Sequence, residues 1–365
     1  MQLGVLKSNS TPLTALVPSL ISKYQKEGFE VFIEAGSGSA SYFDDKAYLD
    51  AGAQILSRKE ILSNCDAILV DSDISDEEIN KVQHHALVIG KFNTLSNPGF
   101  AKELKGKKAQ IFSLDLVPRS SIAQSMDVLS SLASLAGYKA VVVAANLFPG
   151  YFPMMTTAAG TVPPAKVLVL GAGVAGLQAI ATAKRLGASV EAFDVRSAVK
   201  EEVESLGAKF IEVAGSKEDA QAGGYAITQS EEYVQKQREL INDRASKSDV
   251  VITTANIPGR KAPLLIEKGT VEQMKAGSVI IDLASASGGN CELSENDKEI
   301  TVGGVKILGD SKLFHSLPSE ASRLYSTNIY NFIKFVIKDG MDNVPYDHEI
   351  VQKTLVSERI NHLTI

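Results

Sequence analysis

Cysteine is scarce in this sequence, and its scarcity argues against two kinds of protein. The 365-residue chain has two cysteines, Cys65 and Cys291, which lie far apart and form no CxxC pair. We therefore expect neither a disulfide framework nor a zinc site, and no metal elsewhere. The low cysteine content fits a reducing cytosol.

Positive charge and long apolar runs are also lacking. The net charge is −6, which argues against nucleic acid as a partner. The most apolar windows, such as Tyr138–Leu147 and Val162–Leu170, fall short of the roughly 20 apolar residues of a membrane-spanning helix. The first residues, MQLGVLKSNS, lack the pattern of a signal peptide. We expect no direct membrane span.

What the chain does have is enough apolar residues, 44%, and enough length for two cores. Short apolar segments alternate with helical patterns in both halves, which predicts an α/β fold. We expect two Rossmann-like, doubly wound parallel-sheet domains separated by a cleft. The expected domains are residues 1–130 with the helical tail 315–365, and residues 131–314 with a mobile loop near 215–238.

The expected strands are short apolar runs bounded by turn residues. A long helix is expected from Ser121 to about Leu147, and another over Glu320–Ile337. The strands are Leu3–Leu6, Glu30–Glu34, Ala67–Val70, Ala86–Ile89 and Ala109–Ser113, then Val167–Leu170, Ser189–Phe193, Lys209–Ile211, Val250–Thr253, Ser278–Asp282 and Lys306–Leu308.

One stretch, Val167–Asp194, contains every component of a dinucleotide-binding βαβ unit in order. It reads VLVLGAGVAGLQAIATAKRLGASVEAFD, which is a strand, a G-x-G-x-x-G turn, a helix and a second strand ending in an acid. Gly171 is expected to form the tight turn and Gly173 to admit the pyrophosphate. Gly176 is expected to let the helix pack closely on the strand.

The same stretch predicts which dinucleotide binds. The helix N-terminus offers free N–H groups to phosphates. Asp194 lies about 20 residues beyond the glycines, where an acid accepts both ribose hydroxyls and repels a 2′-phosphate. We therefore expect NAD(H), although Arg196 alone could suggest a 2′-phosphate partner. Further expected contacts in this stretch are Ala172, Val174, Ala175, Val195 and Arg196.

Two other segments follow predicted strands at the edge where doubly wound sheets bind ligands. One begins at Asp282 and continues into a Gly-Gly loop, and the other is TTANIPGR. The Gly-Gly segment could instead be only a tight loop that needs glycine backbone angles. The expected cofactor contacts here are Thr254, Ala255, Gly288, Gly289 and Asn290.

A polar cluster in the first domain is a second candidate site. In PRSSIAQSMDVLSS, the Ser-Ser pair is expected to cap a helix that carries Gln124, Asp127 and Ser130 at three-residue steps, with Arg119 just before it. The pattern fits a capped helix with an ordinary polar face. It fits equally a patch facing the cleft, where a nicotinamide carboxamide needs an Arg or Gln partner.

The sequence offers no clear acid/base pair. A dehydrogenase acting on a hydroxy or amino acid needs a His or Lys to exchange the proton that accompanies the hydride. Of the five histidines, only His315, after a predicted strand, is well positioned. Solvated or capping roles are expected for them.

Most of residues 115–330 resembles the NAD(H)-binding component, the alpha subunit, of proton-translocating nicotinamide nucleotide transhydrogenases. The likeness is carried by PRSSIAQSMDVLSSLASLAGYKAV, the fingerprint stretch, GGYA, TTANIPGR and IDLASASGGNCE, in that family's order. Residues 1–110 match more loosely. The resemblance implies that Arg119, Gln124, Asp127 and Ser130 surround the nicotinamide.

The polar stretch near 215–238 by itself fits a solvated surface loop or a mobile lid. The resemblance favours the lid, with Tyr225 closing over the nicotinamide. It also implies NAD(H) as the cofactor in spite of Arg196.

The resemblance implies a division of labour between chains. Hydride transfer between two nicotinamides needs positioning and no proton donor. Because the chain has one dinucleotide fingerprint, NADP(H) is expected on a partner component, and proton translocation in transmembrane subunits. The resemblance further implies a homodimer, cytoplasmic and held peripherally at the inner membrane through its partners.

Two departures from that family and two alternatives remain. Ile122 stands where the family usually has Arg, and Asp71 where a basic run is usual. Alanine dehydrogenase is a close relative, but its functional Arg, Lys and His fall opposite Leu13, Asp71 and about Asn93. An alanine-dehydrogenase-like amino-acid dehydrogenase is one alternative, and a non-catalytic NAD-sensing module is the other.

Overall fold

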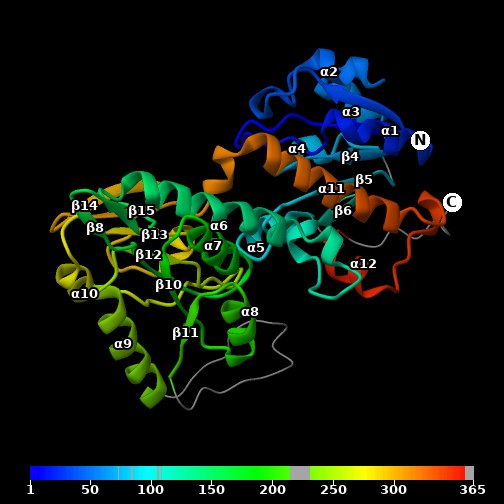
Figure 1. Cartoon of the computed structure of the whole chain (residues 1–365). Helices are drawn as coiled ribbons and strands as arrows, with labels where there is room; N and C mark the ends of the chain where they lie inside the picture. Colours follow the sequence, from blue (N-terminus) through cyan, green and yellow to red (C-terminus); the bar gives the residue numbers. More distant parts are fainter. Residues whose placement is uncertain (73, 84, 105–106, 108, 214–230, 358–365) are drawn as a thin grey trace. The chain divides into compact units, whose positions relative to one another are not determined.

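A computed structural model describes residues 1–365 except 73, 84, 105–106, 108, 214–230 and 358–365. The chain divides into two compact units, residues 1–132 with 315–365, and residues 133–314 (Figure 1). Tyr225 and most of the expected lid lie outside the described residues. The class predicted from the sequence, two doubly wound and mostly parallel α/β sheets, is confirmed.

The first unit is built on a six-stranded parallel sheet with the order β3-β2-β1-β4-β5-β6. The strand order reverses direction between β1 and β4, which makes this position the topological switch point. The strands are β1 Gln2–Val5, β2 Glu30–Glu34, β3 Gln54–Leu56, β4 Ala67–Leu69, β5 Leu87–Gly90 and β6 Gln110–Ser113.

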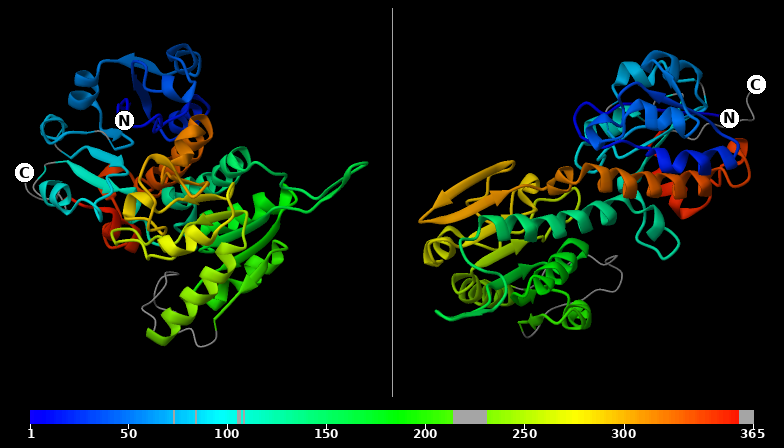
Figure 2. Two further views of the ribbon diagram at one scale, coloured as in Figure 1. Left: turned by 90° about the vertical axis from the view of Figure 1, so that its left-hand side faces the viewer. Right: turned by 45° about the horizontal axis from the view of Figure 1, so that its top comes forward.

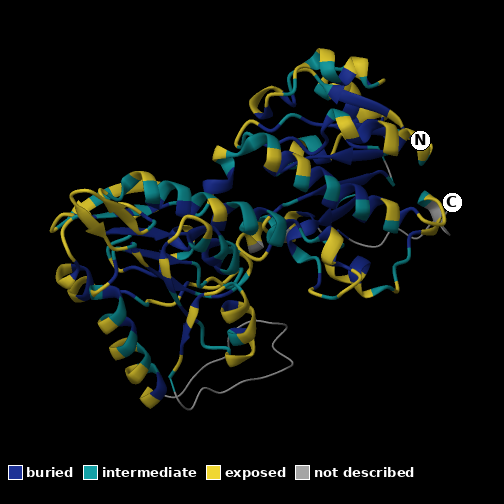
Figure 3. Cartoon of the chain, viewed as in Figure 1, coloured by how far each residue is buried: buried dark blue, intermediate teal, exposed yellow. Residues whose placement is uncertain are grey.

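Helices cover both faces of this sheet because successive strand residues point to opposite sides. Leu3 and Val5 join a core with Tyr325, Ile329 and Phe332 of α11, all nearly inaccessible to solvent (Figure 3). The helices of this unit are α1 Ile21–Lys26, α2 Asp45–Asp50, α3 Arg58–Asn64, α4 Asp76–Ile79, α5 Pro98–Leu104, α11 Pro318–Val336 and α12 Glu349–Thr354.

The second unit has a seven-stranded sheet with the order β11-β10-β9-β12-β13-β15-β14, in which only the edge strand β14 is antiparallel. Its switch point lies between β9 and β12. The strands are β9 Lys166–Leu170, β10 Ser189–Phe193, β11 Lys209–Ile211, β12 Val250–Thr253, β13 Val279–Asp282, β14 Lys298–Val302 and β15 Val305–Gly309. The helices are α7 Val174–Arg185, α8 Lys200–Ser205, α9 Glu231–Ser246 and α10 Lys268–Gln273.

A hairpin of two short strands, β7 Met155–Thr157 and β8 Gly160–Val162, stands apart from the large sheet of the second unit. Figure 2 shows it projecting beyond the rest of that unit. Every residue of both strands is exposed, including Met155 and Val162. The sequence did not predict this hairpin, β3 or β14.

The long helix α6, Val128–Leu147, runs from the first unit into the second. Among the described residues it is the one helix long and apolar enough to cross a membrane, with a mean hydropathy of 1.6 and 39% of the tested window buried. Core helices of soluble proteins pass the same test. The sequence estimate counted only its second half, Tyr138–Leu147, and so underestimated its length.

The start of α6 differs from the prediction. The expected cap at Ser120 or Ser121 is wrong, because that segment forms separate turns and the helix begins at Val128. Asp127 provides the cap instead, since its carboxylate accepts the backbone N–H of Ser130 at 2.9 Å. A carboxylate in this position satisfies an otherwise unpaired N–H group and favours the positive helix end.

A second correction concerns the expected loop near 215–238. Residues from Glu231 onward belong to α9, which continues to Ser246. The helix was missed because its first half is highly charged and presents few apolar residues, of which Tyr233 is buried.

Gly137 of α6 packs directly on the first turn of α7. A Cβ at this position would lie 2.0 Å from the carbonyl oxygen of Ala175. In an exposed helix, Gly137→Ala would stabilise by up to about 1 kcal/mol. Here the clash reverses the sign, and we expect destabilisation by about 1–3 kcal/mol in urea unfolding.

Gly269→Ala in α10 is the matched control, because no described atom lies within 4 Å of its Cβ position. It should leave stability unchanged or raise it slightly. If Gly137→Ala behaved like this control, the close helix contact would be disproved.

Candidate nucleotide-binding site

The G-x-G-x-x-G sequence forms a tight turn between β9 and α7. Gly171 has a φ of 100°, and its N–H donates to the carbonyl of Phe193 at 2.8 Å. A Cβ at Gly171 would lie 2.6 Å from Oγ1 of Thr254, and one at Gly176 would lie 1.8 Å from the carbonyl oxygen of Gly171. Both positions therefore need glycine for packing within the protein.

Gly173 is different, because no described atom lies within 4 Å of its Cβ position. Its φ of −79° is open to any residue, so neither backbone angle nor protein packing requires glycine there. The space is consistent with close approach of a ligand to the backbone. Val174, Ala175 and Gly176 form the first turn of α7, whose N–H groups and dipole favour a phosphate.

Asp194 follows β10 beside this turn, with its side chain 8% exposed. Its Oδ2 accepts the N–H of Ala172 at 2.7 Å, and its Oδ1 accepts the N–H of Arg196 at 2.9 Å. The guanidinium of Arg196 also reaches both oxygens, with Nε 2.9 Å from Oδ1 and one terminal nitrogen 2.8 Å from Oδ2. Val195, between them, is half-buried.

The charge of Asp194 affects two neighbours. Its hydrogen bond and charge, aided by Glu202, raise the pKa of Arg196. Burial, with a contribution from the charge of Asp194, raises the pKa of Tyr233 in α9. Sequence reasoning missed Tyr233, whose only signal is an aromatic residue in an otherwise polar stretch.

The loops after β12 and β13 are joined by one amide and one carboxylate. Asn290 accepts the N–H of Ala255 at 3.0 Å and donates to the carbonyls of Ala255 and Pro263 at 2.9 and 2.8 Å. Asp282 is fully buried and accepts four hydrogen bonds, two of them from the N–H groups of Asn290 and Cys291. These polar side chains fix the loops that border the turn.

Gly288 and Gly289 both have positive φ, 100° and 78°. A Cβ at Gly289 would lie 3.0 Å from a carboxylate oxygen of Asp282. The backbone conformation therefore accounts for both glycines by itself. Thr254 supports the glycine turn from the neighbouring loop, because its hydroxyl donates to the carbonyl of Gly171 at 3.0 Å.

The residues expected around the nicotinamide belong to the first unit. Arg119 and Gln124 are exposed. Asp127 and Ser130 contact each other, with the Ser130 hydroxyl donating to Asp127 at 2.6 Å. His315 lies in the short 3-10 turn Leu313–Ser316.

No group of three or more metal-ligating side chains occurs among the residues that the structure describes. Cys65 and Cys291 are buried free thiols. Burial raises the pKa of Cys65 to about 12 and that of Cys291 to about 11. Both thiols stay protonated near neutral pH, so neither is a candidate nucleophile.

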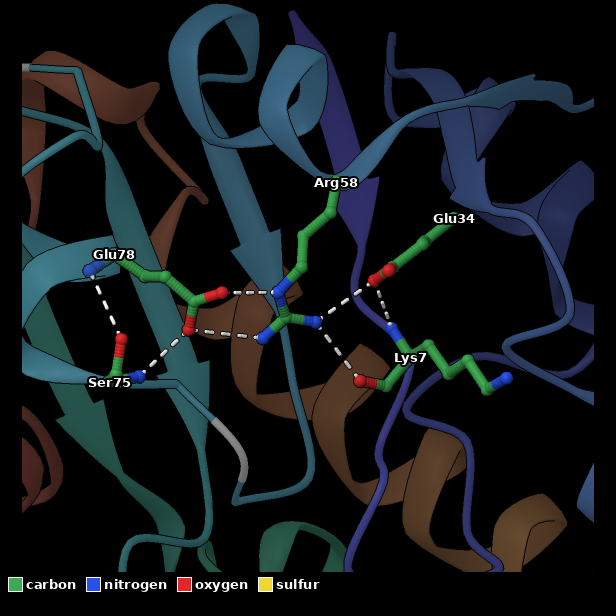
Figure 4. Close-up of polar contacts among 5 residues, drawn as sticks. All are labelled: Lys7, Glu34, Arg58, Ser75 and Glu78. Carbon is green, nitrogen blue, oxygen red and sulfur yellow. Dashed lines mark hydrogen bonds and ion pairs between the residues drawn. The ribbon is translucent and has the colours of Figure 1, made fainter.

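The switch point of the first unit contains an ion-pair network instead of an open turn (Figure 4). Arg58, at the start of α3, bonds Glu78 through Nε at 2.6 Å and Glu34 through a terminal nitrogen at 2.9 Å. It also donates to the carbonyl of Lys7 at 3.1 Å. Glu78 in turn accepts the backbone N–H of Ser75 at 2.9 Å.

The network borders an open depression of 690 Å³. Two carboxylates surround the single guanidinium, so its charge is more than balanced within the protein. An anionic substrate would have to break these ion pairs to bind Arg58. The lining residues are Asn9, Ser10, Arg58, Ser72, Ile74, Ser75 and Glu78.

Both units match a single family in sequence. Residues 10–136 match "Alanine dehydrogenase/PNT, N-terminal domain" and residues 140–362 match "Alanine dehydrogenase/PNT, C-terminal domain". The chain belongs to the alanine dehydrogenase/PNT family.

Within this family the chain is similar to transhydrogenase alpha subunits. It is 44% identical to NAD(P) transhydrogenase subunit alpha of Haemophilus influenzae, over 92% of this chain and 66% of that protein. In Rhodospirillum rubrum the first portion of NAD(P) transhydrogenase subunit alpha is a protein of its own, and the chain is 46% identical to it, over 87% and 85%. The crystal structure of transhydrogenase from Sinorhizobium meliloti superimposes with a TM-score of 0.85 at 39% identity, over 98% and 97%.

The chain therefore belongs with the transhydrogenase alpha subunits, as its sequence predicted. It spans about two thirds of the length of the Haemophilus influenzae relative and most of the Rhodospirillum rubrum one.

Removing Arg58 should destabilise the first unit measurably. Arg58→Met leaves Glu34 and Glu78, both largely buried, without their cation. We expect a loss of about 1–3 kcal/mol in urea unfolding at pH 7. Arg323→Met, which removes an exposed pair with Glu320, should cost less than about 0.5 kcal/mol.

The same difference should depend on pH. The hydrogen bond from Arg58 is the main cause of the lowered pKa of Glu78 in the folded protein. Its stabilising effect is therefore present above the pKa of the unfolded state, about 4.3, and is lost as pH falls through the lower folded value. The gap between wild type and Arg58→Met should shrink below about pH 4. A gap that is constant down to about pH 3 would contradict this assignment.

Proposed function

We propose that this chain is the NAD(H)-binding alpha subunit of a proton-translocating NAD(P) transhydrogenase. The observation that carries the proposal is the open turn at Gly173, which lies against the N-terminus of α7. Asp194 beside it provides an acid for the adenosine ribose. The similarity to named NAD(P) transhydrogenase alpha subunits supports the reaction class.

The cofactor contacts follow from this geometry. Backbone groups of Gly171, Ala172, Gly173, Val174, Ala175 and Gly176 would hold the pyrophosphate. Asp194, Val195 and Arg196 would lie at the ribose, and the loops bearing Thr254, Ala255, Gly288, Gly289 and Asn290 would border the cofactor. An acid at the ribose disfavours a 2′-phosphate, which supports NAD(H) over NADP(H).

NADH, when bound, supplies the hydride that a transhydrogenase delivers to NADP⁺ on a partner component. The chain's own residues need only hold the ring and exclude water, since no carbonyl oxygen gains charge. Arg119 and Gln124 would orient the carboxamide. The Asp127–Ser130 pair would present a fixed polar edge, and Tyr225 would close over the ring.

The partners belong to the same proposal. NADP(H) would be held by a second component, and protons would pass through transmembrane subunits. The chain would form a homodimer on the cytoplasmic side of the inner membrane, held there through these partners. The exposed hairpin residues Met154, Met155 and Val162 offer an apolar surface for the second copy.

Mixing the chain with an NADP(H)-binding transhydrogenase component tests the reaction. We expect transfer from NADH to an NADP⁺ analogue, followed by absorbance, and no NADH oxidation with pyruvate and ammonia. Gln124→Ala should lower the transfer rate with little change in NADH affinity. Gln54→Ala, an exposed glutamine in β3, is the matched control.

Three outcomes of this experiment contradict the proposal. NADH binding without transfer favours a sensing module, and turnover with pyruvate and ammonia favours an amino-acid dehydrogenase. Unchanged transfer in Gln124→Ala would remove that residue from the nicotinamide site. Light scattering on the same sample tests the homodimer, which a monomer mass would exclude.

Two roles of the fingerprint glycines can be separated. Gly173→Ala should weaken NADH binding about tenfold, about 1.4 kcal/mol, while stability stays within about 0.5 kcal/mol. Gly176→Ala should instead destabilise the second unit, because its Cβ would meet the Gly171 carbonyl. NADH fluorescence and urea unfolding measure the two effects. Full NADH affinity in Gly173→Ala would show that the cofactor backbone does not pass there.

A further inference from the structure

The carboxylate of Asp194 has no acceptor position left over. A carboxylate offers about four lone-pair positions, two on each oxygen. Two are taken by backbone N–H groups of Ala172 and Arg196, and two by the guanidinium of Arg196. Each oxygen thus accepts one backbone donor and one guanidinium donor.

The two kinds of donor differ in how easily they can leave. The N–H groups of Ala172 and Arg196 belong to the turn and to the strand end, so they move only with the backbone. The guanidinium is on a flexible side chain that is 24% exposed. It can rotate away without disturbing the core.

The guanidinium presents two neighbouring donors, one to each oxygen, with separations of 2.9 and 2.8 Å. A ribose 2′,3′-diol also presents two neighbouring donors, and an acid at this place in a dinucleotide fold accepts them. Both groups therefore need the same two acceptor positions on Asp194. They cannot occupy these positions together.

We propose that Arg196 is an internal competitor for the adenosine ribose, whose guanidinium must leave Asp194 before the diol can bind. This inference rests on the proposed NAD(H) site and adds a residue that sets its affinity. Dinucleotide affinity is then reduced by the fraction of molecules in which the guanidinium holds the acid. Arg196 lowers affinity for every ligand that carries the diol, and spares ligands without it.

Two nucleotides that differ only in the diol isolate this effect. We would titrate ADP and 2′,3′-dideoxy-ADP by calorimetry into wild type, Arg196→Met and Arg196→Lys. Loss of positive charge near the phosphates affects both nucleotides alike, so it cancels in the ratio of their dissociation constants. The preference for ADP over the dideoxy form should rise roughly three- to tenfold in Arg196→Met.

Arg196→Lys keeps the charge but cannot bridge both oxygens, so the preference should rise at least about twofold there. Arg244→Met is the matched control, since it removes an arginine that is paired with Glu191 in the same unit. It should leave the preference unchanged.

A preference that rises less than about threefold in Arg196→Met, or that falls, overturns the competition. A fall would mean that Arg196 assists the bound ribose. A rise of similar size in Arg244→Met also overturns it, because the effect would then be a general loss of charge. If wild type binds neither ADP nor NADH, the proposed function itself fails. If wild type binds both and the preference does not rise, only the competition fails.

Discussion

The contact between Gly176 and the carbonyl of Gly171 is the constraint on which the rest of the second unit depends. A Cβ at Gly176 would lie 1.8 Å from that oxygen, so the helix can begin this close to the strand only with glycine. The contact fixes the first turn of α7 at the carboxyl end of β9. Because β9 is central, the loops after β10, β12 and β13 gather at the same sheet edge. The acid, the glycine turn and the Asn290 bridge are therefore neighbours as a result of packing.

The two units place opposite chemistry at equivalent positions of the same fold. At the switch point of the second sheet, backbone donors face an open space at Gly173. At that of the first sheet, Arg58 is committed to Glu34, Glu78 and a backbone carbonyl. Asp71, also near this edge, is 1% exposed and accepts the hydroxyl of Thr11. A carboxylate substrate would meet balanced or negative charge there, which argues against an amino-acid dehydrogenase and agrees with a chain that binds its ligand in one unit only.

The sequence was sufficient where local pattern decides structure and insufficient where distant contacts do. Glu30–Glu34 and Ser189–Phe193 are strands with the predicted bounds, because buried apolar runs have few alternatives. The antiparallel strand β14 was missed because it lies at an edge and carries little apolar signal. The cap at Asp127 was misplaced since two serines upstream carry the same local signal. The acid at Asp194 was predictable from spacing, but its pairing with Arg196 depends on side-chain geometry that no motif encodes.

The Asp194–Arg196 pair links the affinity of this site to the task of a hydride carrier. A subunit that delivers a hydride must also release its oxidised cofactor, so tighter binding of the ground state brings no gain in rate. Two residues on one strand end form a ring closed by backbone and side-chain bonds together, which places the guanidinium beside the acid at high effective concentration. The guanidinium returns to the acid as the ribose leaves, so the carboxylate is never left without donors. Arg196 thereby lowers the cost of cofactor release while Asp194 retains its selectivity against a 2′-phosphate.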